Sequence, residues 1–274
     1  MQKPHYTQAE VAAALGGPVT LLGCGAFGET WRRDGTAVKI IWDGSYPQDR
    51  LQREVDGLRR VCSPHVVRLL GTHIVALGVD HRPALVFEYI TGGDVAGRID
   101  AGQLPTVTEA VEFLRGLLTG IGHMHAEQTV HRDIKPANIA LRGGDWSRPV
   151  LLDLGLARGA GEATITTYPA QVGTPAYMGP EQLQGLPARQ ASDLFAAGVT
   201  VRELLGGRHP FYDPGPLPPP AEMIARIAKG PYPLPAGVPG HVAELLDRLT
   251  AERTADRGSA RSSLKRLGAD GAAA

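Results

Sequence analysis

The hydrophobic pattern changes about a third of the way along the chain. Before residue 90, short apolar and β-branched runs separated by turn residues are typical of strands. After it, apolar residues recur at intervals of three and four over longer stretches, which is typical of helices. Strands are expected over residues 19–22, 30–33, 36–41 and 84–87, and helices over 8–15, 50–61, 107–125 and 191–199.

Length and charge narrow the classes of function. The 274 residues can form one large domain or two lobes, and Lys plus Arg equals Asp plus Glu at 28 each. This balance gives no net field that favours nucleic acid or an acidic membrane surface. The two cysteines, Cys24 and Cys62, are too few for a disulfide framework and are expected to be free thiols.

No segment of the chain reads as a membrane anchor or a secretion signal. Apolar runs stay well below the ~18–20 residues of a membrane span. The first residues lack the basic-then-apolar layout of a signal peptide. We therefore expect a cytoplasmic protein, and the abundance of Gly, Pro, Ala and Arg points to a GC-rich bacterial source.

The densest group of polar residues is His131-Arg132-Asp133-Ile134-Lys135-Pro136-Ala137-Asn138. A carboxylate, an ammonium two residues later and a carboxamide five residues later suit a site at which a hydroxyl loses its proton beside a phosphate and a metal. The string resembles the catalytic loop H-R-D-x-K-P-x-N of eukaryotic-type Ser/Thr protein kinases. The resemblance implies Asp133 as the base, Lys135 as the group that neutralises phosphoryl charge, and Asn138 as a metal ligand.

A glycine motif lies in the first third of the chain. Gly23, Gly25 and Gly28 have G-x-G-x-x-G spacing, which lets backbone N–H groups approach phosphate oxygens. The spacing also fits a dinucleotide-binding turn, but that turn needs a helix to follow. Here a strand, an Asp34-Gly35 turn and a second strand follow, which resembles the nucleotide-covering hairpin of the kinase family.

Lys39 and Glu54 are a candidate ion pair. Lys39 lies in a strand pattern, so its two neighbours should face the opposite side of the sheet. Glu54 lies at the edge of the apolar stripe of helix 50–61, where breaking a buried pair would cost roughly 3–5 kcal/mol. The alternatives are a surface position for Lys39 and a local pair of Glu54 with Arg50 or Arg53. In the family, the equivalent pair holds the lysine against the ATP phosphates.

The resemblance also implies a set of residues that contact ATP. Phe87 would gate the back of the adenine pocket, and the backbones of Glu88 and Ile90 would bond the adenine edge. Asp94 would meet the ribose hydroxyls, and Gly92-Gly93 would mark the hinge. The implied set is Leu22, Gly23, Cys24, Gly25, Ala26, Phe27, Gly28, Glu29, Thr30, Ala37, Lys39, Phe87, Glu88, Ile90, Asp94 and Ala140.

Asp153 would complete the metal site. Asp153-Leu154-Gly155 follows a short apolar strand and resembles the D-F-G motif of the family. Oxygen ligands from Asn138 and Asp153 would leave room for waters and phosphates around Mg²⁺ or Mn²⁺. The segment 157–171 would be the activation loop. Phosphorylation of Thr164, Thr166 or Thr167 would pair with Arg132, the alternative being an ordinary loop.

Residues 173–181 resemble the family string G-T-x-x-Y-M-A-P-E, with Gly179 in place of Ala. The resemblance implies that Thr174 contacts Asp133 and Lys135, and that Glu181 needs a buried cation. Arg257 is the candidate for that cation. A local pair of Arg257 with Glu252 or Asp256 is the alternative.

The helical run 191–199 is apolar nearly all round, which indicates burial. Ser192 is expected to cap this helix, and Asp193 to anchor the backbone of the catalytic loop. His209-Pro210-Phe211 is expected to follow as a loop anchor.

These motifs fall in family order over residues 19–260 and predict an α+β, bilobal protein-kinase-like fold. We expect an extension at 1–14, an N-lobe at 15–90, a C-lobe at 91–267 and a short tail at 268–274. ATP would bind between the lobes with Mg²⁺, and its γ-phosphate would pass to Ser or Thr hydroxyls of proteins, with autophosphorylation in the activation loop.

Three rival functions remain. A pseudokinase usually lacks the lysine, the base or the metal aspartate, and all three are present here. A small-molecule kinase of the same superfamily, such as an aminoglycoside phosphotransferase, lacks the Lys-Pro after the base and the Gly-Thr-Pro to Pro-Glu anchor. A nucleic-acid module is disfavoured by the neutral charge.

Overall fold

The computed structural model describes residues 3–25, 28–42, 48–153, 175–213 and 215–268, without the side chains of residues 48–50, 53 and 54. The chain divides into two compact units. Unit 1 comprises Met1–Cys62 and Val67–Tyr89, and unit 2 comprises Ser63–Val66 and Ile90–Ala274. Residues 1–14, which the kinase motifs leave outside the domain, therefore lie in unit 1.

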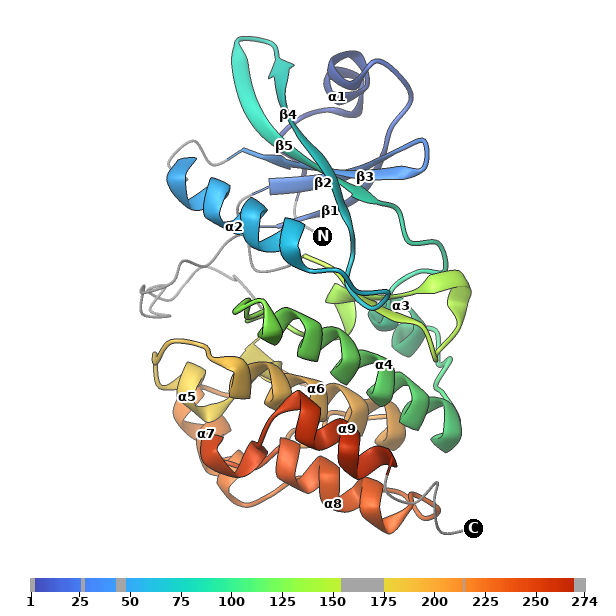
Figure 1. The fold of residues 1–274 in the computed structure, drawn as a ribbon, viewed down its shortest axis with the longest axis vertical. Coiled ribbons are helices and arrows are strands. Elements are labelled where there is room, and N and C mark those ends of the chain that lie inside the picture. Colours follow the sequence, from blue (N-terminus) through green and yellow to red (C-terminus); the bar gives the residue numbers. More distant parts are fainter. Residues whose placement is uncertain (1–2, 26–27, 43–47, 154–174, 214, 269–274) are drawn as a thin grey trace. The chain divides into compact units, whose positions relative to one another are not determined.

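Unit 1 is built on a five-stranded antiparallel sheet with the strand order β1-β2-β3-β5-β4 (Figure 1). Asp34 takes a φ of 49° in the two-residue turn between β2 and β3, a conformation that a short polar side chain tolerates. Helix α2 (Gln48–Arg60) also belongs to this unit. The strands are β1 (Thr20–Cys24), β2 (Gly28–Arg33), β3 (Thr36–Ile41), β4 (Leu69–Leu77) and β5 (Asp80–Glu88).

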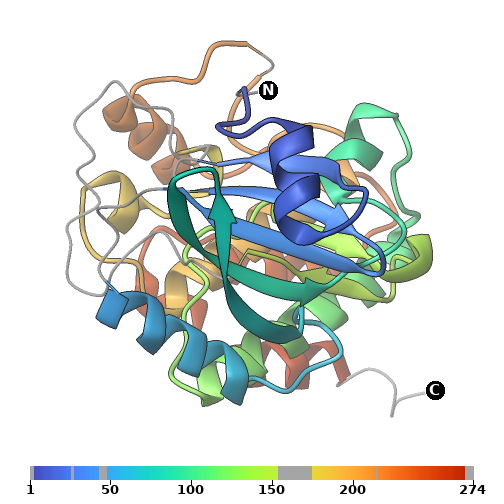
Figure 2. The ribbon, with the colours of Figure 1, turned by 90° about the horizontal axis from the view of Figure 1, so that it is seen from above.

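Helix α1 (Gln8–Leu15) covers one face of this sheet (Figure 2). The Thr7 side chain accepts from the backbone N–H of Glu10 and starts the helix, and Gly16 ends it with a φ of 73°. Val11 of α1 is fully buried in a cluster that includes Trp31 of β2. The predicted helix and its Thr7 cap are confirmed.

The alternation of β3 places Lys39 on the sheet face away from α1. Val38 and Ile40 belong to the same buried cluster as Val11, so they face α1. In the sheet, Lys39 pairs with Thr30 of β2 on one side and with Leu85 of β5 on the other. The prediction that the neighbours of Lys39 face the opposite side is confirmed.

Unit 2 is mainly helical and carries one two-stranded sheet (Figure 1). Its longest described helix, α4, begins with a capping box between Thr106 and Glu109 and contacts α6 and α9. The helices are α3 (Val95–Asp100), α4 (Val107–Ala126), α5 (Pro180–Leu183), α6 (Gln190–Gly206), α7 (Pro220–Ala228), α8 (Gly240–Leu249) and α9 (Ala260–Gly268). Strands β6 (Ile139–Leu141) and β7 (Pro149–Leu151) and the 3-10 turns Pro136–Asn138, Arg142–Gly144, Pro175–Tyr177 and Thr254–Arg257 complete it.

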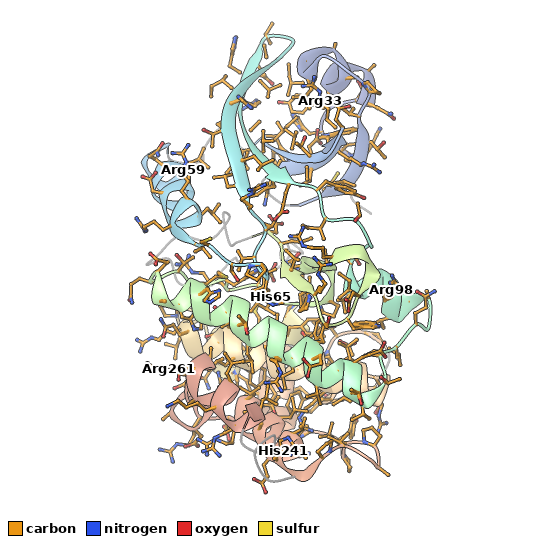
Figure 3. The ribbon with its side chains drawn as sticks, turned by 45° about the vertical axis from the view of Figure 1, so that its right-hand side comes forward. Arg33, Arg59, His65, Arg98, His241 and Arg261 are labelled. Carbon is orange, nitrogen blue, oxygen red and sulfur yellow. The ribbon has the colours of Figure 1, made fainter. Side chains whose placement is uncertain are left out.

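His65 joins a short early segment of the chain to unit 2, beside α4 (Figure 3). Its ring Nδ1 lies 2.8 Å from the carbonyl oxygen of Pro149, and its own carbonyl accepts from the N–H of Leu151 at 2.9 Å. A Cβ at Gly120 would lie 2.8 Å from the His65 carbonyl oxygen, so α4 needs glycine there. Burial lowers the pKa of His65, with only partial opposition from the bond to Pro149.

Among the helices of the described ranges, we find none with the length and apolar character needed to cross a bilayer.

Candidate active site

The catalytic-loop residues singled out by the sequence converge on one carboxylate. They lie between α4 and β6, where the 3-10 turn Pro136–Asn138 folds the chain back. Oδ2 of Asp133 accepts from Nζ of Lys135 at 2.9 Å and from Nδ2 of Asn138 at 3.0 Å. Nδ2 of Asn138 also donates to the backbone oxygen of Asp133 at 2.8 Å. Spacings of two and five residues thus bring all three side chains together.

His131 is buried beneath this loop, bonds its backbone and has no exposed surface. Its Nε2 lies 2.7 Å from the backbone oxygen of Leu152, and its Nδ1 accepts from the N–H of Asp133 at 3.4 Å. These two bonds assign the proton to Nε2, because a carbonyl oxygen can only accept. His131 therefore ties the loop to the segment that leads into Asp153.

Asp193 of α6 anchors the backbone of the catalytic loop, as predicted. Its carboxylate is 1% exposed and accepts from the N–H groups of His131 at 2.9 Å and Arg132 at 2.8 Å. Nε2 of His125 lies 2.9 Å from the same carboxylate. Arg132 has a φ of 74°, a conformation that costs about 1–3 kcal/mol for a residue other than glycine. The two N–H bonds to the Asp193 carboxylate hold that strained backbone.

The expected cap of α6 differs from the structure. Arg189 is the N-cap residue, and Ser192 lies three positions inside the helix. Oγ of Ser192 accepts from the N–H of Arg189 at 3.0 Å and donates to Oε1 of Glu181 at 2.7 Å. The Ser192 hydroxyl thus bonds the N-cap residue of α6 from a position inside the helix, and it also bonds the Glu181 carboxylate.

Asn138 and Asp153, the two candidate metal ligands, are connected through the backbone. The N–H of Leu152 donates to the carbonyl oxygen of Asn138 at 2.8 Å, one residue before Asp153. Asp153 itself is exposed and has a φ of 55°. The remainder of the D-L-G motif, Leu154 and Gly155, lies outside the described residues.

The glycine motif flanks the turn between β1 and β2. The N–H of Gly25 donates to the carbonyl oxygen of Gly28 at 2.8 Å, and a Cβ at Gly28 would clash with the backbone oxygen of Ile40. Gly28 is therefore pressed directly against β3. Cys24 pairs with Glu29 across the ladder, and burial, helped by the Glu29 charge, raises the pKa of the Cys24 thiol.

The other nucleotide residues implied by the resemblance are distributed over both units. In unit 1, Gly23 pairs with Thr30, which also pairs with Lys39, while Ala37 pairs with the buried Phe87. The N–H of Glu88 donates to Arg68 O, and Leu22 is exposed. In unit 2, Ile90 is buried, and Asp94 caps α3 by accepting from the N–H of Gly97 at 2.8 Å and forms a backbone bridge to Ala140.

Several predicted positions lie outside the described residues. They include Ala26 and Phe27 of the glycine motif, the side chain of Glu54, Thr174 and the activation-loop residues Thr164, Thr166 and Thr167. The Lys39–Glu54 pair and the contact of Thr174 with Asp133 and Lys135 therefore stay predictions.

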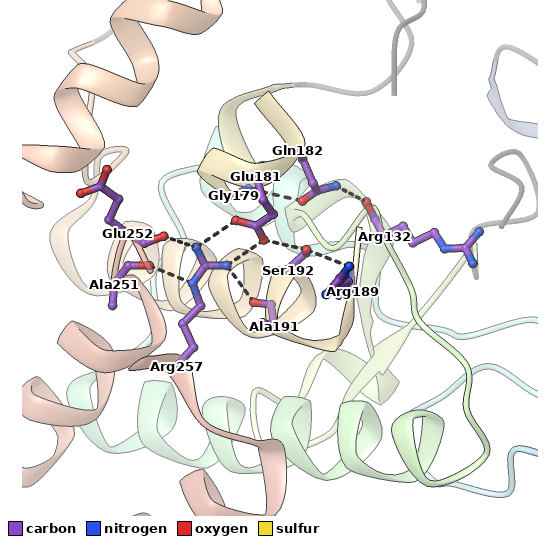
Figure 4. Close-up of polar contacts among 10 residues, drawn as sticks. All are labelled: Arg132, Gly179, Glu181, Gln182, Arg189, Ala191, Ser192, Ala251, Glu252 and Arg257. Carbon is purple, nitrogen blue, oxygen red and sulfur yellow. Dashed lines mark hydrogen bonds and ion pairs between the residues drawn. The ribbon is translucent and has the colours of Figure 1, made fainter. Parts of the chain in front are cut away.

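The predicted cation for Glu181 is Arg257 (Figure 4). NH1 and NH2 donate to the two carboxylate oxygens at 2.8 and 3.0 Å. The remaining guanidinium hydrogens go to the backbone oxygens of Ala251, Glu252 and Ala191, and the group lies 4.7 Å from the Phe195 ring centroid. Arg257 thus bonds the backbone of Glu252 and the side chain of Glu181, which rules out the local alternative.

This pair lowers the pKa of Glu181. Burial raises the pKa of the carboxyl group, but the hydrogen bonds and charge of Arg257, together with the Ser192 hydroxyl, outweigh it. Gln182, the next residue, reaches the catalytic loop, where its Nε2 donates to the Arg132 carbonyl oxygen at 3.3 Å. The pair is therefore connected to the loop through one residue (Figure 4).

Two further contacts hold the segment 175–178 in unit 2, and no pattern in the sequence predicts the first of them. The Tyr177 hydroxyl donates to Oε2 of Glu203 at 2.6 Å, and burial raises the pKa of both groups. The carbonyl oxygen of Ala176 accepts from Nε2 of His209 at 3.0 Å and from the Tyr212 hydroxyl at 3.1 Å. Burial lowers the pKa of His209 to about 4, so it is neutral near pH 7. The expected loop anchor at His209 is confirmed.

The chain belongs to the protein kinase domain family, whose model matches residues 19–267. The Ser/Thr protein kinase SRK2C of Arabidopsis thaliana is 31% identical over 222 residues, covering 78% of this chain and 63% of that protein. The Ser/Thr protein kinase PkaB of Streptomyces coelicolor is 32% identical over 251 residues, covering 86% of this chain and 58% of that protein. The chain thus spans about three fifths of the length of these relatives.

The fold is also that of a solved kinase structure. The crystal structure of Rad53 residues 1–466 in complex with AMP-PNP superposes with a TM-score of 0.69 at 24% identity, over 90% of this chain and 63% of that one. The expected α+β protein-kinase-like fold, with a strand-rich part followed by a helical part, is confirmed.

Alanine, which the family string has at the position of Gly179, should destabilise this chain. A Cβ there would lie 2.7 Å from both carboxylate oxygens of Glu181, which Arg257 holds in place. We expect Gly179→Ala to lower the free energy of unfolding by about 1–3 kcal/mol, the usual cost of overpacking. Urea unfolding checks this.

The matched control is Gly206→Ala. Gly206 is the last residue of α6 and has no atom within 4 Å of a built Cβ. This control should be neutral or should stabilise by about 0.4–1 kcal/mol, because alanine restricts the unfolded chain. Equal stability of the Gly179 variant and the wild type would show that Glu181 can move aside.

Proposed function

We propose that the chain is an ATP- and Mg²⁺-dependent enzyme that transfers the γ-phosphate of ATP to Ser or Thr hydroxyls of proteins. The observation that carries this proposal is the arrangement around Asp133. Lys135 and Asn138 both donate to Oδ2, so this oxygen is committed within the loop. Oδ1 takes no part in these two bonds and is the atom to which a substrate hydroxyl would donate.

The three side chains would divide the chemistry among them. Asp133 would orient the hydroxyl and accept its proton, while Lys135 would stabilise negative charge on the transferring phosphoryl group. The same ammonium donates to the Asp133 carboxylate, so the two side chains are held side by side at the point of transfer. Specificity for Ser and Thr rests on the resemblance of His131 to Asn138 to the family loop and on the named relatives.

The donor set around Asn138 fits Mg²⁺. Its amide nitrogen bonds Asp133 twice, which directs the amide oxygen away from Asp133. That oxygen and the exposed carboxylate of Asp153 are hard ligands of the kind Mg²⁺ prefers, and two protein ligands leave positions for phosphate oxygens. A bound Mg²⁺ would neutralise the β- and γ-phosphate charge.

The nucleotide would be held by the residues that the family resemblance implies. The N–H groups of the glycine motif would face its phosphates, with Lys39 and Glu54 as the supporting pair. Phe87, Glu88, Ile90 and Asp94 would surround the adenosine. The proposed N-lobe at 15–90 and C-lobe at 91–267 follow from these assignments.

The enzyme would also phosphorylate its own activation loop. Thr164, Thr166 and Thr167 are the candidate sites, and Arg132 is the candidate partner of the added phosphate. The strained backbone of Arg132 is held by Asp193, so its position does not depend on phosphorylation. A phosphate added to the loop would then gain the Arg132 side chain as its charged partner.

A phosphotransfer assay tests the proposed function. The purified chain, incubated with labelled ATP, Mg²⁺ and a generic protein substrate, should transfer label to Ser or Thr and to itself. Chelation of Mg²⁺ should abolish the transfer. Mass spectrometry of the product should find phosphate on Thr164, Thr166 or Thr167.

Two outcomes would contradict parts of this proposal. Absence of transfer with Mg²⁺, Mn²⁺ and varied substrates would favour a pseudokinase. A fully active enzyme with an unmodified activation loop would remove the autophosphorylation step while leaving the transfer reaction.

A further inference from the structure

The side chain of Glu29, directly after the glycine motif, is buried against the start of the chain. It is 1% exposed. Oε2 accepts from the backbone N–H of His5 at 2.8 Å and of Tyr6 at 3.5 Å, and Oε1 accepts from Nε1 of Trp31 at 2.9 Å. A buried carboxylate without such donors is strongly disfavoured, so these bonds make the position of Glu29 depend on residues 5 and 6.

Residues 3–17, which we call the N-terminal strap, are attached to unit 1 at several further points. The Tyr6 ring is buried in the same cluster as Trp31, and its hydroxyl donates to Asp80 at 3.2 Å and accepts from Nε of Arg82 at 2.9 Å. At the other end, the Gly16 carbonyl accepts from Arg33, the last residue of β2, at 3.5 Å (Figure 3). The strap is therefore hydrogen-bonded to both ends of β2, to Glu29 at its start and to Arg33 at its end.

The strap lies outside the region that defines the family. The family model begins at residue 19, after the strap ends. Its contacts are nevertheless part of the core, because Val11 has no exposed surface. The strap thus belongs to the core of unit 1 although it precedes the part of the chain that the family model matches.

Glu29, which is hydrogen-bonded to the strap, is next in sequence to the glycine motif. Gly28 is the adjacent residue, and it is pressed against the Ile40 backbone and closes the base of the loop by accepting from Gly25. A shift of Glu29 would move Gly28 along β3, and with it the N–H groups at the base of the loop. A single peptide unit therefore separates the residue that contacts the strap from the residue at the base of the loop.

We propose that the N-terminal strap positions the glycine motif through Glu29, and that strap docking raises the affinity for the phosphates of ATP. Glu29 is a positioning residue in this scheme, because its side chain faces the strap. The affinity part of the inference rests on the proposed ATP-dependent function. The coupling of strap and loop stands without it.

The test compares the Glu29→Gln variant with the wild-type chain of 274 residues. Glutamine keeps the shape but places one amide NH₂ among N–H donors, which should weaken strap docking. We expect the Kd and KM for ATP to rise about fivefold or more, the lower end of typical coupling between two sites, with kcat within about twofold. Hydrogen exchange without nucleotide should speed up both in residues 5–10 and in residues 23–30.

Two more variants make the result decisive. Tyr6→Phe removes only the hydroxyl bonds to Asp80 and Arg82, keeps the ring and the Glu29 carboxylate, and should give smaller changes in the same direction. Glu112→Gln, at an exposed pair with Arg115 in α4, should change neither Kd nor exchange. If Glu29→Gln does not fold, Tyr6→Phe decides by the direction of the changes: a higher Kd for ATP together with faster exchange in both segments supports the inference, and exchange that is unchanged in residues 23–30 overturns it.

Faster exchange in the strap with unchanged exchange in residues 23–30 would overturn the inference, as would unchanged exchange in both segments. A fall in kcat with an unchanged KM would also contradict it, since a loop-positioning role acts on nucleotide binding. Failure of the wild type to bind ATP would instead refute the proposed function, and the exchange data would still decide whether strap and loop are coupled.

Discussion

Replacement of Asp133 by Asn should lower the rate of phosphate transfer by about 10²–10⁴-fold, the range for removal of a general base. The amide can still receive the bonds from Lys135 and Asn138 at one oxygen, so the loop should keep its shape. It cannot accept the hydroxyl proton. The measurement is kcat with a protein substrate, together with the KM for ATP, which should change little.

Asp145→Asn is the matched control. Its carboxylate is exposed and accepts from the N–H and the hydroxyl of Ser147, in a turn that lies seven residues beyond Asn138. This variant should transfer phosphate at the wild-type rate. An unchanged rate in the Asp133 variant, with an unchanged melting temperature, would remove Asp133 from the mechanism.

Replacement of Arg257 by Met should lower the free energy of unfolding by roughly 3–5 kcal/mol, the cost of breaking a buried ion pair. Methionine fills much of the space but leaves the Glu181 carboxylate without its cation and three backbone oxygens without donors. The urea midpoint of unfolding should fall with an unchanged slope. Arg226→Met, at the exposed Glu222 pair, should shift the midpoint only marginally.

The effect of Arg257→Met should depend on pH in one direction. The pKa of Glu181 is lowered in the folded chain, so its pairing contributes above the ordinary pKa of a glutamate, about 4.3. The contribution disappears as the pH falls through the lower folded-state value. The gap between variant and wild type should therefore be constant near pH 6–8 and narrow in acid. A gap independent of pH would indicate a packing loss alone.

The contacts that the sequence predicted are of two kinds. Asp133, Lys135 and Asn138 lie within six residues, so local chain geometry brings them together once the turn forms. Arg257 and Glu181 are far apart in sequence, and only the order of motifs shared with the kinase family could connect them. The same holds for Asp193 and the catalytic loop.

Other contacts had no readable signal. The Tyr177–Glu203 bond and the hydrogen bonds of Glu29 to residues 5 and 6 join segments that are distant in sequence. The sequence pattern of each segment predicts its own secondary structure and contains no sign of the other. Serine favours the N-cap position, which predicts Ser192 as the cap, but in the structure Arg189 takes that position and Ser192 donates to Glu181. The helix-capping propensity of serine reflects local structure alone, whereas the contact with Glu181 determines the role of Ser192 in the fold.

The burial of α1 has a practical consequence for how this chain is produced. A fragment cut at the family boundary would begin at Val19 and lack Tyr6 and Val11. It would present Trp31, Val38 and Val75 to solvent as one apolar patch, of the kind that promotes aggregation. For expression, crystallisation or tagging, a fragment that keeps this core intact must therefore begin before Tyr6, well ahead of the boundary that sequence similarity outlines.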